Sequence, residues 1–100
     1  MTIRSKKARL LARGRDCTLR LIGYCNYNNE TTVACHIGKN RGMGHKCGDN
    51  MIVYACSGCH DVLDSRVKRD YSPGELAIEK LRALEESQRI MHDNEVMVIV

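Results

Sequence analysis

Aromatic residues are scarce in this sequence: tryptophan and phenylalanine are absent, and there are four tyrosines among 100 residues. Large aromatic side chains usually anchor a core, so a chain of this size without them has a thin one. The length predicts one domain, spanning residues 1–100. Small scaffolds commonly depend on disulfides or a structural metal. The composition therefore predicts a fold held together partly by cysteine chemistry.

A long apolar run is also missing. Met1 to Arg15 contains only short apolar pieces, and no stretch reaches the length of a signal peptide or a membrane span. We therefore expect a cytoplasmic protein that does not contact a membrane. In a reducing compartment, the six cysteines are more often metal ligands than disulfide partners, so we favour a metal over disulfides.

Positive charge is concentrated at the N-terminus, although the net charge of the chain is only +4. Residues 1–20 hold seven basic side chains and one acidic one, whereas residues 75–95 hold three basic and six acidic ones. A basic arm can neutralise phosphates of a nucleic acid, but it can also be a solvated helix face. The predicted nucleic-acid-binding residues are Arg4, Lys6, Lys7, Arg9, Arg13 and Arg15 in the arm, with Arg41 and Lys46 in a later loop.

Hydrophobic patterning predicts a small α+β domain, in which helices and short strands alternate. We expect a basic arm (1–16), a core (17–68), a C-terminal helix (72–92) and a tail (95–100). The expected elements are a helix from Ser5 to Arg13 that stops at Gly14, a strand from Cys17 that turns at Gly23, strands over Thr31 to Ile37 and Asn50 to Ala55, a helix within Cys56 to Val67, and a terminal strand or apolar tail over Met97 to Val100.

The C-terminal helix has the clearest start signal. Ser72 suits the N-cap, Pro73 suits the first helical position, and Glu75 completes a capping box. The helix should be amphipathic. Its predicted apolar stripe consists of Leu76, Ile78, Leu81, Leu84 and Ile90.

Four cysteines have spacings that suit a metal site. Cys56 and Cys59 form a CxxC pair, and Cys17 and Cys25 form a wider pair with seven residues between them. Four thiolates complete the closed tetrahedral shell of a structural zinc ion, to which folding would be coupled. The alternative for the wider pair is two buried free thiols. Of the two remaining cysteines, Cys35 should pack in the core, and Cys47 lies in a glycine-rich loop without an assigned role.

A second group of polar residues suits phosphodiester chemistry. His60 and Asp64 are four residues apart, so a helix places them on one face, where they can hold a divalent ion. His36 lies on the preceding strand, and Asn50 could accept a hydrogen bond from a ring nitrogen of His36 and fix its tautomer. A neutral histidine can then take a proton from an attacking water. Each residue also has an ordinary explanation as part of the surface or the core.

The order of these residues resembles that of HNH endonucleases, the ββα-metal class. The resembling stretch runs from Cys17 to Asp64 and includes VACHI, DNMIVYAC and SGCHDVLD. More closely, the motifs GRDC, ETTV, ACHI and YACSGCHDVLD resemble a family of small putative nucleases of lambdoid phages and prophages. The resemblance implies an HNH-like ββα-metal domain stapled by zinc and acting in a bacterial host cell.

Site roles follow from the same resemblance. It implies His36 as general base, Asn50 as the residue that orients it, and His60 with Asp64 as ligands of a catalytic ion such as Mg²⁺. The sequence departs from the family pattern at Cys35, where an acidic residue or histidine is common, and at Asn50, which is shifted by one residue. Either Asp49 or Asn50 can therefore fill the orienting role.

These observations favour a metal-dependent DNA endonuclease or nickase that acts in phage DNA recombination or processing. Its expected partner is DNA, double-stranded or branched. Two other functions fit the sequence. One is a non-catalytic zinc module that binds nucleic acid, and the other is a phage protein that binds a host protein through the helix from Ser72 to His92.

Overall fold

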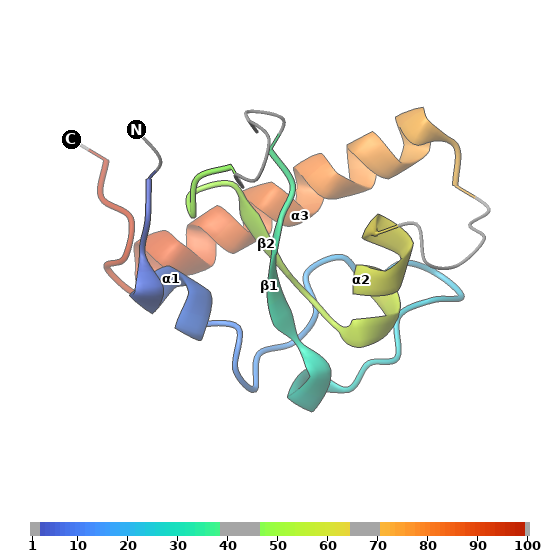
Figure 1. Cartoon of the computed structure of the whole chain (residues 1–100), viewed down its shortest axis with the longest axis horizontal. Coiled ribbons are helices and arrows are strands. Elements are labelled where there is room, and N and C mark those ends of the chain that lie inside the picture. The colour runs from blue at the N-terminus through green and yellow to red at the C-terminus, as the bar shows by residue number, and fades with distance from the viewer. Residues whose placement is uncertain (1–2, 39–46, 65–70, 100) are drawn as a thin grey trace.

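A two-stranded antiparallel sheet lies at the centre of the chain (Figure 1). The computed structural model describes residues 3–38, 47–64 and 71–99. Strand β1 pairs with β2 so that Val33 lies opposite Ala55 and His36 lies opposite Ile52. In chain order, the elements are α1 (Lys6–Leu10), the 3₁₀ helix η1 (Asn29–Thr31), β1 (Val33–His36), β2 (Ile52–Ala55), α2 (Ser57–Leu63) and α3 (Pro73–Asp93).

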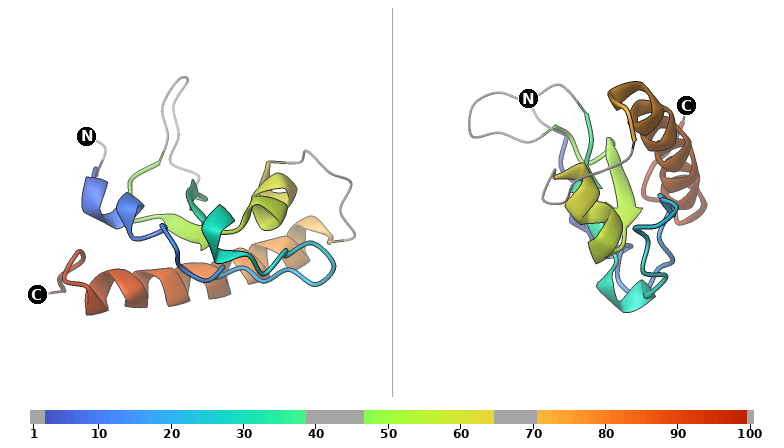
Figure 2. Two further views of the ribbon diagram at one scale, coloured as in Figure 1. Left: turned by 90° about the horizontal axis from the view of Figure 1, so that it is seen from below. Right: turned by 90° about the vertical axis from the view of Figure 1, so that its right-hand side faces the viewer.

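The helices enclose this sheet from two sides. Helix α3 runs along one side, and α1 and α2 lie towards opposite ends of the other (Figure 2). Strand β2 is therefore buried at all four positions. Ile52 and Tyr54 pack with α1 and the end of α3, whereas Val53 and Ala55 pack in the larger cluster beside α2.

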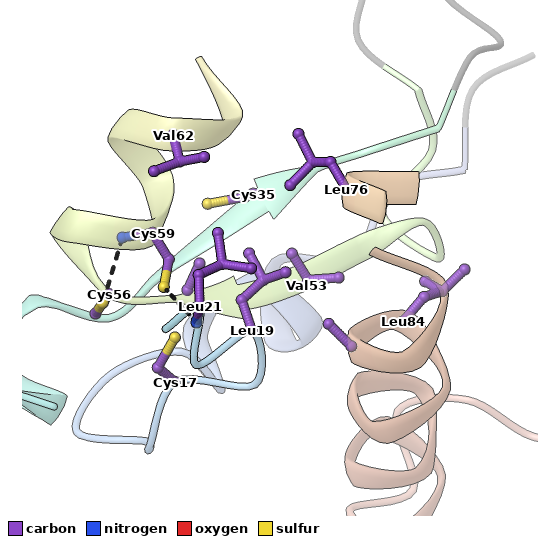
Figure 3. Packing of buried hydrophobic residues seen from close by; sticks show 12 residues of the cluster. Cys17, Leu19, Leu21, Cys35, Val53, Cys56, Cys59, Val62, Leu76 and Leu84 are labelled. Carbon is purple, nitrogen blue, oxygen red and sulfur yellow. Dashed lines mark hydrogen bonds between the residues drawn. The ribbon is translucent and has the colours of Figure 1, made fainter. Parts of the chain in front are cut away.

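The larger of the two apolar clusters joins the cysteine region to the sheet and to α3 (Figure 3). It contains Leu19, Leu21, Val62 and Leu76, all buried. Cys35 belongs to the same cluster, as predicted, with 5% of its surface exposed. The core is thus made of aliphatic and sulfur-containing side chains. Tyr54 is the large exception, and its hydroxyl donates to the carbonyl oxygen of Ala8 over 2.7 Å.

Capping residues set the helix boundaries where the sequence predicts them. Ser5 caps α1 by accepting from the amide of Ala8, and Ser72 forms a capping box with Glu75 at the start of α3. Helix α1 ends earlier than predicted, at Leu10, and a turn leads from there to Gly14, whose φ is +69°.

The predicted strand over Cys17 to Cys25 is wrong. This segment is a series of bends and turns, with the predicted turn at Gly23, where φ is +84°. Leu19 and Leu21 do point into the core, as strand alternation requires, but Arg20 between them has φ of +48°, outside the β region. The burial of Leu19 and Leu21 therefore arises from a loop that wraps around the core, and Thr18, expected on the polar face, is buried as well.

The predicted apolar stripe of α3 is only partly correct. Leu76 and Leu84 are buried against the sheet, but Ile78 and Leu81 are 68% and 66% exposed. The helix covers the sheet with one narrow face, and these two residues point away from it. Of the two alternatives expected for the C-terminus, the described residues 97–99 form no strand, and exposed Val98 and Ile99 fit the apolar tail. None of the helices in the described part of the chain combines the length and apolarity that a bilayer crossing needs.

Candidate metal centre and candidate nuclease site

The two predicted cysteine pairs meet. The Sγ atoms of Cys17, Cys25, Cys56 and Cys59 all lie within 4.8 Å of one another. Those of Cys25 and Cys56 are 3.7 Å apart, and tetrahedral ligands at a Zn–S distance of about 2.3 Å are separated by about 3.8 Å. A disulfide would need about 2.0 Å, and all of these cysteines are free. The cluster can hold a metal ion such as zinc.

The start of α2 supplies two of the sulfurs. Cys56 is the N-cap, and its Sγ accepts from the amide of Cys59 over 3.4 Å. Gly58 between them is required by packing, because a Cβ there would collide with the carbonyl oxygen of Tyr24. The CxxC turn and the preceding cysteine loop therefore touch backbone to backbone, which places the second pair of sulfurs beside the first.

The loop from Cys17 to Cys25 supplies the other two sulfurs and further amide donors. The amide of Arg20 donates to the Sγ of Cys17, and the amide of Leu21 donates to the Sγ of Cys59, each over 3.4 Å. Such bonds stabilise thiolates. The bends found where a strand was predicted therefore direct backbone amides towards the cysteine sulfurs.

The thiols affect one another electrostatically. The hydrogen bond from Cys59 lowers the pKa of Cys17 to about 4, and the same bond, together with burial, raises the pKa of Cys59. Burial raises the pKa of Cys25 to about 11. Four thiolates this close to one another repel, and a bound cation would offset that repulsion. Metal binding would therefore favour the ionised form of the thiols and release their protons.

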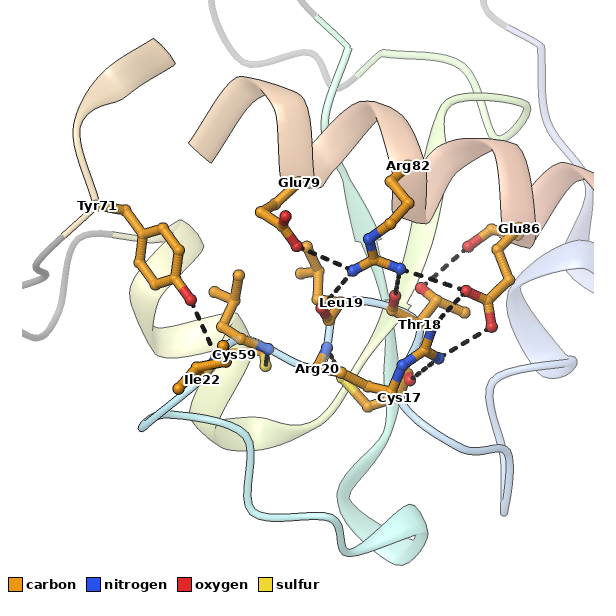
Figure 4. A network of polar contacts seen from close by, with 12 residues as sticks. Cys17, Thr18, Leu19, Arg20, Ile22, Cys59, Tyr71, Glu79, Arg82 and Glu86 are labelled. Atoms are coloured by element: carbon orange, nitrogen blue, oxygen red, sulfur yellow. Dashed lines mark hydrogen bonds and ion pairs between the residues drawn. The ribbon is translucent and has the colours of Figure 1, made fainter. Parts of the chain in front are cut away.

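Helix α3 holds the cysteine loop from outside (Figure 4). The Arg82 guanidinium donates to the carbonyl oxygens of Thr18 and Leu19, over 3.1 and 2.6 Å. Glu86 accepts two bonds from Arg20, over 2.9 and 2.8 Å. The loop is therefore fixed to α3 by paired charges as well as by the core.

His36 at the end of β1 has a carboxylate as its ring partner. Its Nε2 atom lies 2.7 Å from Oδ1 of Asp49, and both side chains are largely buried. We expected Asn50 or, as the alternative, Asp49 to bind this ring. The carboxylate of Asp49, which precedes β2, meets the ring, and the backbone carbonyl of Asn50 accepts a hydrogen bond from the side chain of Gln88. A difference of one residue in this turn therefore decides which side chain, that of Asp49 or that of Asn50, meets the ring.

Asp49 is also bound by the N-terminal segment. Its Oδ2 accepts from the backbone amide of Ser5 over 2.7 Å and lies 3.2 Å from Nε of Arg9. Burial alone would raise the pKa of the Asp49 carboxyl, but the bonds from Ser5 and His36 and the Arg9 charge hold it below its ordinary value. The carboxylate is therefore charged at neutral pH. The Arg9 contact was not predicted, because the sequence places its partner forty residues away.

His60 and Asp64 lie on one face at the end of α2. The Nε2 atom of His60 is 3.0 Å from Oδ2 of Asp64, and both side chains are partly exposed. Over the described residues, however, the four-cysteine cluster is the one place where three or more potential ligands converge. His36 therefore does not join His60 and Asp64 in one cluster there.

Neither of the two extra cysteines belongs to that cluster. Burial, followed by the charge of Asp64, raises the pKa of Cys35 to about 12, so its thiol is neutral and acts as a core side chain. Cys47 is buried, and its Sγ accepts a hydrogen bond from the amide of Gly38 over 3.2 Å.

The predicted nucleic-acid-binding residues have different environments. Arg4, Lys6, Lys7 and Arg13 are exposed. Arg9 is bound to Asp49, and Arg15 donates to the carbonyl oxygen of Leu11 over 2.8 Å. Arg41, Lys46 and Val67 lie outside the described residues.

Together, these features define a small α+β protein in which a four-cysteine, metal-capable cluster supports a β-hairpin and the helix that follows it. A family model described as "Putative nuclease YbcO" matches residues 6–97. The chain belongs to this YbcO family.

Individual relatives agree with the family match. The chain is 47% identical over 60 residues to "Putative nuclease YbcO" of Escherichia coli K12 and, equally, to "Putative nuclease ybcO" of Enterobacteria phage 82. Each match covers 58% of this chain and 62% of the relative, so somewhat less than two thirds of each relative is matched. A solved structure, titled "Structure of a putative bacteriophage protein from Escherichia coli str. K-12 substr. MG1655", superposes with a TM-score of 0.72 at 35% identity. That match covers 89% of this chain and 100% of the solved one.

Proposed function

We propose that this protein is a metal-dependent DNA endonuclease or nickase of the HNH type, acting in phage DNA recombination or processing. One observation carries the proposal. The hairpin carries a histidine–carboxylate pair, His36 with Asp49, and the helix that follows the hairpin presents His60 beside Asp64. The order β–β–α is the one that a ββα-metal nuclease requires, and the family carries the description "Putative nuclease" and includes a phage protein.

His36 is the proposed general base. An ionised Asp49 accepts a hydrogen bond from Nε2–H of His36, and in that tautomer Nδ1 is the ring nitrogen without a proton and is the proposed basic atom. His36 takes a proton from water while the water oxygen bonds to phosphorus, and the bond from phosphorus to the 3′ oxygen breaks. Exposed basic residues of the arm, such as Lys6 and Arg13, would neutralise neighbouring phosphates.

Two kinds of metal have different roles in this proposal. A zinc ion held by Cys17, Cys25, Cys56 and Cys59 would be structural, because four protein sulfurs leave no open position. His60 and Asp64 would hold Mg²⁺ or a similar ion, with water or substrate oxygens as the remaining ligands. That ion would supply charge stabilisation for the phosphate and the leaving oxygen.

The test is cleavage of supercoiled, linear and branched DNA with Mg²⁺ or Mn²⁺. We expect nicking by the wild type, and at least about a hundredfold loss in His36→Ala, since general-base catalysis contributes about 10²–10⁴-fold. Arg89→Gln on the exposed surface of α3 is a control for preparation and charge. Equal nicking by the wild type and His36→Ala would reject the site.

A non-catalytic nucleic-acid-binding module is the second candidate. The neutral, buried thiol of Cys35 favours it, because Cys35 stands where the resembling nucleases commonly carry a metal ligand. This candidate predicts salt-dependent DNA binding without cleavage in any divalent ion.

A further inference from the structure

The Asp49 carboxylate connects the hairpin histidine to the first helix. Only 5% of Asp49 is exposed, so its charge needs partners. One oxygen lies 2.7 Å from Nε2 of His36, while the other meets the Ser5 amide at 2.7 Å and Nε of Arg9 at 3.2 Å. Each oxygen thus faces a different part of the chain.

The position of Asp49 depends on α1. Its own amide donates to the carbonyl oxygen of Ile3 over 2.8 Å, so the backbone is held there as well as the side chain. Ser5 is also the N-cap of α1. The residue that caps the helix is therefore also one of those that fix the carboxylate.

We infer that α1 is part of the candidate catalytic site: Arg9 and the Ser5 amide hold Asp49, and Asp49 is a positioning residue for His36. This inference rests on the proposed function for its catalytic meaning. The Arg9 side chain is 45% exposed, so its guanidinium can meet a DNA phosphate while Nε still faces Asp49. One residue then contributes both to DNA binding and to the orientation of the base.

The inference separates Arg9 from the other basic residues of the arm. Lys6 is exposed on the same helix and has the same charge. Loss of a simple phosphate contact raises KM and leaves kcat unchanged. Loss of a group that orients the base also lowers kcat, and orienting partners typically contribute about 10–100-fold.

The experiment compares Arg9→Gln with Lys6→Gln, which remove the same charge. We expect both to raise KM, and Arg9→Gln alone to lower kcat by about tenfold or more. Asp49→Asn has nearly the same shape and should lower kcat more strongly, with little change in KM. Its neutral amide cannot replace the charged carboxylate as the hydrogen-bond acceptor of the ring. Arg9→Lys keeps the charge but not the Nε contact, and it should recover KM better than kcat.

A second measurement does not depend on cleavage. The ¹⁵N spectrum of the His36 ring, recorded on the metal-loaded protein without DNA, reports which nitrogen carries the proton. We expect changes in Asp49→Asn and Arg9→Gln and none in Lys6→Gln. Identical ring spectra in all variants would overturn the inference, whether or not the protein cuts DNA. Equal KM effects for Arg9→Gln and Lys6→Gln, with kcat unchanged in both, would overturn it as well.

Discussion

Replacing Cys25 by serine tests the metal centre most directly. Cys17, Cys56 and Cys59 are buried core residues, so their substitution would disturb packing as well as ligation. Cys25 is only partly buried, and its replacement by the similar side chain of serine costs little packing. Loss of stability in Cys25→Ser therefore reports mainly on the metal.

The expected effect is large. A structural zinc ion contributes about 10–16 kcal/mol of apparent binding free energy in small domains, and the whole free energy of unfolding of a domain is only about 5–15 kcal/mol. A weakened site should therefore lower the free energy of unfolding by several kcal/mol. Chelation should unfold the wild type to a similar extent.

Cys35→Ala is the matched control. Cys35 is 5% exposed and lies in the same cluster, but outside the sulfur group. Its loss should cost about 1–2 kcal/mol of packing and leave one metal ion per chain. The measurements are metal content by mass spectrometry and urea unfolding with and without a chelator. If Cys25→Ser retained one tightly bound ion and the wild-type unfolding midpoint, the proposed ligand set would be incorrect.

Two further predictions follow from the same geometry. Gly58→Ala should lower both metal content and unfolding midpoint, because its methyl group would meet the Tyr24 carbonyl. Gly74→Ala, in open space near the start of α3, should keep or raise stability by about 0.5–1 kcal/mol, and equal midpoints for the two variants would contradict this packing. The pKa of Asp49 is depressed in the folded protein, so its stabilising contribution is present above its ordinary pKa of 3.8 and is lost as the pH falls below that value. Acid titration of unfolding stability should therefore be shallower in Asp49→Asn, and an unchanged acid limb would contradict the assignment.

Local sequence signals predicted the parts of the fold that depend on local chemistry. The capping box at Ser72 and the CxxC turn at Cys56 are set by hydrogen bonds between residues three positions apart, and the structure contains both. The two hairpin strands were also predicted, although β1 and β2 are shorter than expected. Their β-branched residues suit a sheet, although β2 is buried at all four positions and not on one face alone.

The features that the sequence could not predict depend on contacts between distant residues. Alternation at Leu19 and Leu21 indicated a strand, but the segment has no strand partner in the described structure and instead bends around sulfur. Ile78 and Leu81 were predicted to be core residues. Both are exposed, because the narrow sheet covers only one face of α3.

The candidate catalytic pair illustrates the same limit at the scale of one residue. The motif pointed to His36 as the proposed base, whereas its partner depended on the exact turn before β2. The sequence allowed Asp49 or Asn50, and the structure places the Asp49 carboxylate at the ring. The anchoring of that carboxylate by Ser5 and Arg9 is a tertiary contact without a local sequence signal.

The hydrogen bonds from Arg82 to two loop carbonyls limit how far this protein can be shortened and still keep its fold. A fragment ending after α2 would retain every proposed ligand and the whole hairpin, yet two backbone oxygens near the first cysteine would lose their donor. We therefore infer that α3 stabilises the cysteine loop from outside the β–β–α segment. A minimal unit designed from the β–β–α segment alone would need a substitute for it.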